Sequence, residues 1–162
     1  MNIRKIISFF LQTVFVGFIL IGIPIFLISL NNYLNLPAYH NVYYKSVGTI
    51  FIAIGLGAVI YSAILHLKTG RTTPLPVIEQ PKRFIVNGLY KYCRNPMYLS
   101  EIFIFLGLFF LFGHLLLLLY PLLFFLIIHV FVVYAEEPEL RKRFGEQYVK
   151  YTKKVPRWIP KI

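Results

Sequence analysis

The chain has 162 residues, of which 58% are hydrophobic and only 14% are charged. This composition excludes an ordinary soluble globular protein and indicates one membrane-embedded domain over residues 1–162. The net charge of +11 does not indicate nucleic-acid binding, because the basic residues flank apolar stretches, where they attract the anionic headgroups of membrane lipids.

The first half of the chain contains two stretches without charged residues, 6–30 and 46–67. A membrane-spanning helix needs roughly 20 apolar residues, so each stretch predicts one span. A cleaved signal peptide is the alternative for the first stretch, but the apolar run is too long and no small-residue cleavage site follows it. In the second stretch, Ala53 and Gly57 have the spacing that allows two helices to approach closely.

The second half contains a longer apolar stretch, 97–134, in which Glu101 is the only charged residue. The dipeptide Gly113-His114 lies near its middle and predicts a tight turn. We therefore expect a hairpin of two spans, 97–112 and 115–134.

The basic residues predict the orientation of the spans. All Lys and Arg residues except Lys45 fall in three segments, 4–5, 68–94 and 141–161. Four spans place all three segments on one side, which the positive-inside rule assigns to the cytoplasm, whereas three spans would place one of them outside. The sequence thus predicts an all-α integral membrane protein with about four transmembrane helices and both termini in the cytoplasm.

Two segments outside the spans have their own character. The cytoplasmic loop 68–94 is rich in proline and partly apolar, which is typical of a lid on the membrane face. In the cytoplasmic tail 135–162, we expect Pro138 to end or kink the fourth span and Trp158 to anchor the tail at the membrane surface. An amphipathic interfacial helix is predicted in this tail from residues at helical spacing, Leu140, Phe144, Tyr148 and Tyr151.

The stretch RNPMYLSE opens the predicted hairpin and carries polar residues that a simple span does not need. Asn95 is a suitable N-cap, and Pro96 suits the first helical position. Arg94, Tyr98 and Glu101 are spaced at about one helical turn and share one side of the helix.

The far end of the hairpin carries a second polar group. His129 and Glu136 are seven positions apart and lie on one face of a helix. Folding at the predicted turn brings Tyr98 level with His129, and it brings Arg94 within one turn of the pair Glu136-Glu137. The two ends of the hairpin are therefore expected to face each other.

Ionisable groups inside a membrane pair with one another or line a wet cavity. Glu101 and His129 lie roughly 8–10 Å inside the cytoplasmic boundary, at about 1.5 Å per residue. For these two residues alone, a structural ion pair and a cavity remain equal alternatives. For Arg94, Tyr98 and the two glutamates at one membrane level, a binding cavity is favoured.

The residue types indicate what such a cavity would bind. Arg94 and the positive end of the helix that begins at Pro96 suit a carboxylate or phosphate. Paired carboxylates suit an ammonium group, a ribose hydroxyl or another cation, and Tyr rings offer their faces to a sulfonium. S-adenosylmethionine meets all three demands, although chemistry alone leaves it one candidate among several.

Two segments resemble the membrane-embedded isoprenylcysteine carboxyl methyltransferase and phospholipid methyltransferase family. They are GRTTPLPVIEQPKRFIVNGLYKYCRNPMYL at 70–99 and HVFVVYAEEPELRKRFGEQYVKYTKKVPRWIP at 129–160. RNPMY followed by EEPxLxxxFGxxYxxY is the specific combination, and it is most similar to small bacterial members. The resemblance implies S-adenosylmethionine binding without a Rossmann domain, in agreement with the lack of a GxGxxG motif. It also implies a bacterial inner-membrane protein with its active site facing the cytoplasm.

The resemblance further implies roles for individual residues. Glu136, Glu137 or His129 would take a proton from an ammonium acceptor, and no metal ligand is expected. Glu101 stands where many members have an apolar residue, and we expect it to contact the acceptor. The residues expected to bind the cofactor are Arg94, Pro96, Tyr98, His129, Glu136, Glu137, Tyr148, Tyr151 and Arg157.

The sequence therefore predicts an S-adenosylmethionine-dependent methyltransferase that acts on a lipophilic acceptor, either an isoprenoid carboxylate or thiol or a lipid amine. The expected reaction is in-line attack on a sulfonium methyl group, promoted by alignment and desolvation. The alternative is a non-enzymatic membrane protein, such as a small transporter subunit or an assembly factor. A transporter is expected to place polar groups near mid-membrane, whereas this chain gathers them at one face.

Overall fold

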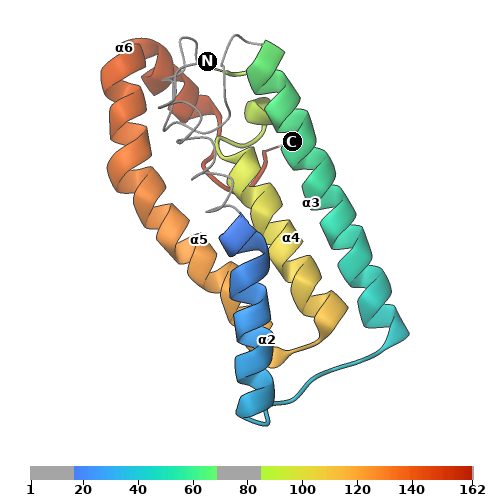
Figure 1. Ribbon diagram of the computed structural model, residues 1–162. Coiled ribbons are helices and arrows are strands. Elements are labelled where there is room, and N and C mark those ends of the chain that lie inside the picture. Colours follow the sequence, from blue (N-terminus) through green and yellow to red (C-terminus); the bar gives the residue numbers. More distant parts are fainter. Residues whose placement is uncertain (1–16, 69–84, 162) are drawn as a thin grey trace, which may run out of the picture.

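The computed structural model describes residues 17–68 and 85–161, and within these ranges the chain is helical and contains no strand. The expected all-α fold is thus confirmed for these residues. Figure 1 shows the long helices side by side, with α4 between α3 and α5. The elements are η1 (Phe18–Gly22), α2 (Ile23–Tyr33), α3 (Val42–Lys68), η2 (Gly88–Lys91), α4 (Pro96–Phe112), η3 (Leu115–Leu118), α5 (Leu119–Phe131), η4 (Val132–Glu136) and α6 (Glu137–Lys154).

Two helical stretches are long and apolar enough to cross a membrane, Val42–His66 and Leu115–Lys154. Two shorter apolar helices are Phe18–Tyr33 and Pro96–Phe112. The predicted spans after residue 17 therefore coincide with helices. Residues 6–16 of the first predicted span, and residues 69–84 of the expected lid, lie outside the described residues.

The hairpin turns where the sequence predicts it. α4 ends at Phe112, and Gly113 adopts a positive φ of 70° while its N–H donates to the Phe109 carbonyl at 2.7 Å. A Cβ atom on Gly113 would collide with the carbonyl oxygen of Tyr39, so the turn requires glycine here. The turn brings the start of α4 and the end of α5 to the same end of the molecule (Figure 1).

The loop between α2 and α3 is bonded to this turn. Tyr39 N–H donates to the Gly113 carbonyl at 2.9 Å. Asn31 is fully buried; its Nδ2 donates to the Leu36 carbonyl at 3.0 Å, and its Oδ1 accepts from the Leu116 N–H at 3.0 Å. One amide thus joins the end of α2 to the hairpin, and the helices are fastened together at the end away from the polar residues.

Pro138 was expected to end or kink the fourth span and to lie in the first turn of a new helix; it does lie in the first turn of α6, but the helical path is continuous there. α5 continues through the π-helical turn η4 into α6, and the Glu137 N–H donates to the Val132 carbonyl within that turn. Proline is tolerated in the first turn of a helix, where its missing N–H removes no essential bond. The chain changes direction later, at Gly145, with φ 54° and ψ −132°. Figure 1 shows α6 turning over and returning toward the start of α4, so the predicted amphipathic helix has two parts.

The closest helix contact joins α3 and α4, and glycines form it. A Cβ atom on Gly55 would lie 2.6 Å from Cγ1 of Ile104, and one on Gly48 would lie 2.7 Å from the Gly107 carbonyl oxygen. Among the described residues, nothing lies within 4 Å of the Cβ position of Gly57, so the expected close approach through Ala53 and Gly57 is not found there. α4 packs instead on the face of α3 that carries Gly48 and Gly55.

We predict that Gly55→Ala destabilises the protein by roughly 1–3 kcal/mol, because the added methyl overpacks the contact with α4. Gly57→Ala is the matched control. It should be neutral or stabilising by up to about 1 kcal/mol, because alanine favours the helix and space is open there. Unfolding of both variants in detergent measures the difference. Equal stabilities would contradict the proposed helix contact.

Candidate active site

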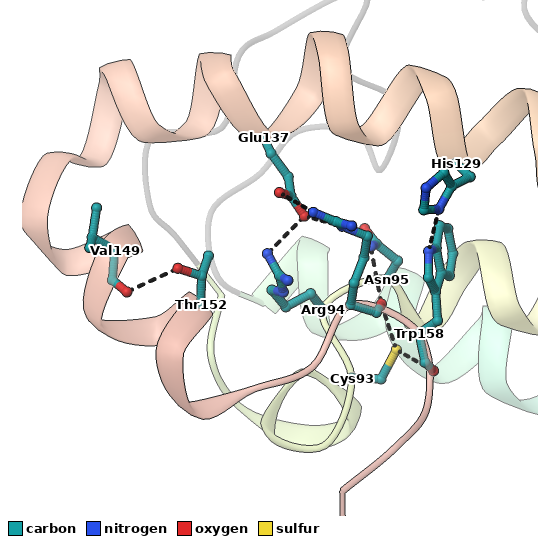
Figure 2. Close-up of polar contacts among 9 residues, drawn as sticks. Cys93, Arg94, Asn95, His129, Glu137, Val149, Thr152 and Trp158 are labelled. Carbon is teal, nitrogen blue, oxygen red and sulfur yellow. Dashed lines mark hydrogen bonds and ion pairs between the residues drawn. The ribbon is translucent and has the colours of Figure 1, made fainter.

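The polar residues expected at the start of the hairpin lie at the entry into α4. Pro96 is buried in the first turn of α4. Asn95 occupies the N-cap position, as predicted, but its side chain does not cap the helix. Its Nδ2 instead donates to the carbonyl of Arg157 at 3.2 Å, and Sγ of the buried Cys93 donates to the same carbonyl at 3.3 Å (Figure 2).

Residues 155–161, here called the C-terminal strap, lie across this entry segment. The Arg94 N–H donates to the Pro156 carbonyl at 2.9 Å, and the Lys161 N–H donates to the Tyr92 carbonyl at 3.1 Å. The bend at Gly145 directs the second part of α6 back toward α4 and so allows this contact. The strap therefore brings Arg157 next to Arg94.

Glu137 is the centre of an ion cluster with Arg94 and Arg157. Nη1 of Arg94 donates to Oε1 of Glu137 at 2.7 Å. Arg157 binds both carboxylate oxygens, from Nε to Oε1 at 2.7 Å and from Nη2 to Oε2 at 2.9 Å. The side chains of Arg94 and Glu137 are only 13% and 14% exposed. The cluster is therefore mostly withdrawn from water, and charge-assisted bonds of this kind are strong.

The expected approach of Arg94 to the glutamate pair is thus present in the structure. Tyr98 of α4 also reaches across the hairpin, and its hydroxyl donates to Oε2 of Glu136 in η4 at 3.1 Å. The two ends of the hairpin meet through two polar contacts that involve neighbouring glutamates. Their catalytic and binding roles remain predictions.

The ion cluster fixes the protonation state of Glu137. Burial raises the pKa of this carboxyl, but the hydrogen bond from Arg157 and the charges of Arg94, Arg157 and Arg141 outweigh burial and hold the pKa below its usual value. The hydrogen bond to Glu137 in turn raises the pKa of Arg157. Glu137 is consequently an anion at neutral pH and a poor proton acceptor.

Two tyrosines of the returning part of α6 complete the surroundings. Tyr148 is only 2% exposed, and burial raises its pKa above the usual value, followed by the effect of the Glu137 charge. The Tyr151 hydroxyl donates to the Tyr90 carbonyl at 2.7 Å, and the ring centroids of Tyr148 and Tyr151 lie 6.3 Å apart. Both residues therefore stay neutral phenols close to the ion cluster.

His129 does not form the ion pair with Glu101 that was one of the two sequence-based alternatives. Its Nδ1 accepts a hydrogen bond from Nε1 of Trp158 at 3.0 Å (Figure 2). The Trp158 ring packs edge-on against Phe125. Trp158 is therefore bonded to α5, and its role as a membrane-surface anchor stays a prediction. Among the residues that the structure describes, Glu101 has no hydrogen bond and no ion pair.

Sequence reasoning missed a further polar contact beside the site. His66, at the end of α3, is 3% exposed, and its Nε2 lies 2.7 Å from the hydroxyl of Tyr90 in η2. No periodicity could relate these residues, because they come from different elements with the segment 69–84 between them. The strap contacts of Cys93 and Asn95 were missed for the same reason, since they join segments far apart in the chain.

The described residues define an all-helical protein of membrane type, with an arginine–glutamate cluster at one end of a helical hairpin. A family model described as phospholipid methyltransferase matches residues 43–147. The match covers more than half of the chain, and the chain belongs to this family. The family resemblance seen in the sequence is thereby confirmed, and membership indicates a methyltransferase of lipid-type substrates.

The family match contains Arg94, Tyr98, Glu136 and Glu137 but ends before Arg157. Searches for relatives found no similar curated protein and no similar solved structure.

We predict that Glu137→Gln lowers the stability at neutral pH by about 3 kcal/mol or less, because two partly buried arginines lose their counter-charge. The pKa of Glu137 is lower in the folded protein than its ordinary value of 4.5. The contribution of Glu137 to the free energy of unfolding should therefore be fully present above pH 4.5 and should be lost as the pH falls through the lower pKa of the folded state. Unfolding in detergent at several pH values measures it.

The control for this substitution is Glu146→Gln. Glu146 pairs with Lys150 at 3.7 Å, but its side chain is 91% exposed, so its loss should be nearly without effect. A pH-independent difference between wild type and Glu137→Gln would contradict the assigned ion cluster.

Proposed function

We propose that this protein is an S-adenosylmethionine-dependent methyltransferase whose acceptor is lipophilic, an isoprenoid carboxylate or thiol or a lipid amine. The ion cluster of Arg94, Glu137 and Arg157 beside the Tyr98–Glu136 contact is the observation that carries the proposal. Family membership supports a methyltransferase over a transporter subunit or assembly factor.

The residues present fit the cofactor. Nε of Arg94 is buried and has no hydrogen-bond partner among residues 17–68 and 85–161, so a donor remains for a carboxylate. Glu136 would bind an ammonium or ribose hydroxyl, and the rings of Tyr98 and Tyr148 would surround a sulfonium. When bound, S-adenosylmethionine supplies an electrophilic methyl group.

The geometry also ranks the candidate bases. Glu137 is a weak base because two arginines neutralise it, and Nδ1 of His129 is occupied by Trp158. Glu136 follows in η4 and accepts a hydrogen bond from the neutral hydroxyl of Tyr98, and we assign to it the proton that an ammonium acceptor must lose. A carboxylate acceptor would need no base, and the protein would then contribute positioning and exclusion of water.

We further propose four membrane spans with both termini and the active site on the cytoplasmic side of a bacterial inner membrane. Two helices of sufficient length, two shorter apolar helices and the distribution of Lys and Arg support this topology. The soluble cofactor would then enter from the cytoplasm, and the acceptor would enter from the lipid.

This topology predicts the labelling of introduced cysteines by a membrane-impermeant maleimide. Asn32→Cys should react in intact spheroplasts, whereas Lys153→Cys should react only after permeabilisation. Native Cys93 can be retained, because it is buried and burial raises the pKa of its thiol. The reverse labelling pattern, or labelling of both sites from one side, would overturn the orientation.

The proposed cofactor site predicts that Arg94→Ala and Glu137→Ala weaken S-adenosylmethionine binding by about 10- to 100-fold, the effect expected when a charge-assisted hydrogen bond is lost. Calorimetry in detergent measures the affinity, with folding checked by circular dichroism. Arg143→Ala is the control, because Arg143 is exposed and stacks on Phe144. Unchanged affinity in both folded site variants would remove the assignment.

The acceptor can be identified with the same protein. Transfer of a radiolabelled methyl group into a total membrane lipid extract, followed by identification of the labelled product, separates a lipid amine from an isoprenoid acid or thiol. The Glu136→Gln variant should lower transfer to an amine more than transfer to a carboxylate, because both reactions lose a cofactor contact but only the amine also loses its base.

A further inference from the structure

A cleft of about 260 Å³ lies between α3 and the start of α4. Ile54 and Ala58 of α3 form one wall, and Pro96 and Leu99 of α4 form the other. Gly55, which packs closely against Ile104 and Ser100 of α4, also lines the cleft.

The cleft offers hydrocarbon surface and little else. Its two small polar side chains are already bonded: the Ser100 hydroxyl donates to the Pro96 carbonyl at 2.6 Å, and the Cys93 thiol donates to the carbonyls of Arg157 and Trp158. A polar headgroup would find few hydrogen-bond partners in the cleft, whereas an alkyl chain needs none. The volume is slightly below the roughly 300 Å³ of the smallest drug-sized pockets, which suits one part of a lipid.

The cleft is open toward the outer surface of the helices and adjoins the ion cluster. Ile54 is 54% exposed and Tyr92 is 47% exposed, so the rim lies on the surface that a membrane would cover. Cys93 and Pro96 flank Arg94 in the chain, so the entry segment 92–96 is a wall shared by the cleft and the ion cluster. Pro160 of the C-terminal strap closes the cleft on that side.

We propose that this α3–α4 cleft holds one hydrocarbon chain of the methyl acceptor and so positions the acceptor's polar end at the ion cluster. The proposal rests on the proposed methyltransferase function and adds the part of the acceptor that is recognised. Burial of each methylene strengthens binding by roughly fourfold until the cleft is full. Acceptors with chains too short to fill the cleft are therefore bound weakly.

The test uses the full chain in vesicles and a series of monoacyl glycerophosphoethanolamines of increasing chain length. For the wild type, KM should fall with each added methylene and then reach a plateau. Ala58→Phe places a ring in the cleft and should move the plateau to shorter chains. Ala53→Phe is the matched control, because Ala53 is exposed on another face of α3, and its chain-length profile should equal that of the wild type.

A second measurement does not depend on catalysis. A phosphatidylethanolamine with a diazirine in its chain is photolysed in the vesicles, and the labelled peptides are identified by mass spectrometry. Labelling at Leu99 should decrease in Ala58→Phe but not in Ala53→Phe. Equal labelling in both variants overturns the cleft assignment.

The possible results of these experiments distinguish failure of the cleft proposal from failure of the proposed methyltransferase function. Methyl transfer with identical chain-length profiles in wild type and Ala58→Phe would overturn the cleft proposal and leave the methyltransferase intact. Reduced labelling without a change in the profile would mean that a bulk lipid occupies the cleft, which also overturns the proposal. Lack of S-adenosylmethionine binding by the wild type would instead contradict the proposed function.

Discussion

The bonding of one carboxylate by two arginines determines the arrangement of the site. Glu137 receives Arg94 from the start of α4 and Arg157 from the C-terminal strap, so three segments far apart in the chain meet at one anion. Without this anion, two guanidinium groups would repel each other in a mostly buried place. The glutamate therefore organises the site, and its neighbour Glu136 adds a second contact across the hairpin by accepting a hydrogen bond from Tyr98.

Backbone irregularities at two positions make this meeting possible. The π-helical turn η4 precedes Pro138 without a break in the helix, and the bend at Gly145 then reverses the chain. The φ of 54° at Gly145 favours glycine, which gives a physical reason for the FG step in the EEPxLxxxFG pattern. The returning part of α6 places Tyr148 against the ion cluster and leads into the strap.

The sequence was most informative where a contact depends on position along a helix. A hairpin closed at Gly113 was enough to bring Arg94 to Glu137 and Tyr98 to Glu136, because helical rise is fixed and the turn is short. It was least informative where packing selects among similar faces. Ala53-Gly57 and Gly48-Gly55 are both rows of small residues, and only the second faces α4.

Contacts of the irregular segments could not be predicted either. An ion pair between His129 and Glu101 was one of two equal alternatives because both are ionisable at similar depth, but the strap brings Trp158 to His129 as a neutral donor. Nothing in the local sequence at 155–161 specifies where a chain without regular structure will lie. The resemblance to a family located Arg157 in the site, whereas the residue pattern alone did not.

The buried amide of Asn31 makes the two ends of the helical bundle differ in how they are held together. It joins α2 to the hairpin turn, and the Tyr39 N–H donates to the Gly113 carbonyl beside it. Hydrogen bonds therefore connect α2, the loop before α3 and the hairpin turn at that end of the bundle. At the opposite end, α3 and α4 enclose an apolar cleft with few polar bonds across it. Between α3 and α4 the bundle therefore relies on apolar packing at this end, whereas polar bonds join the helices at the turn.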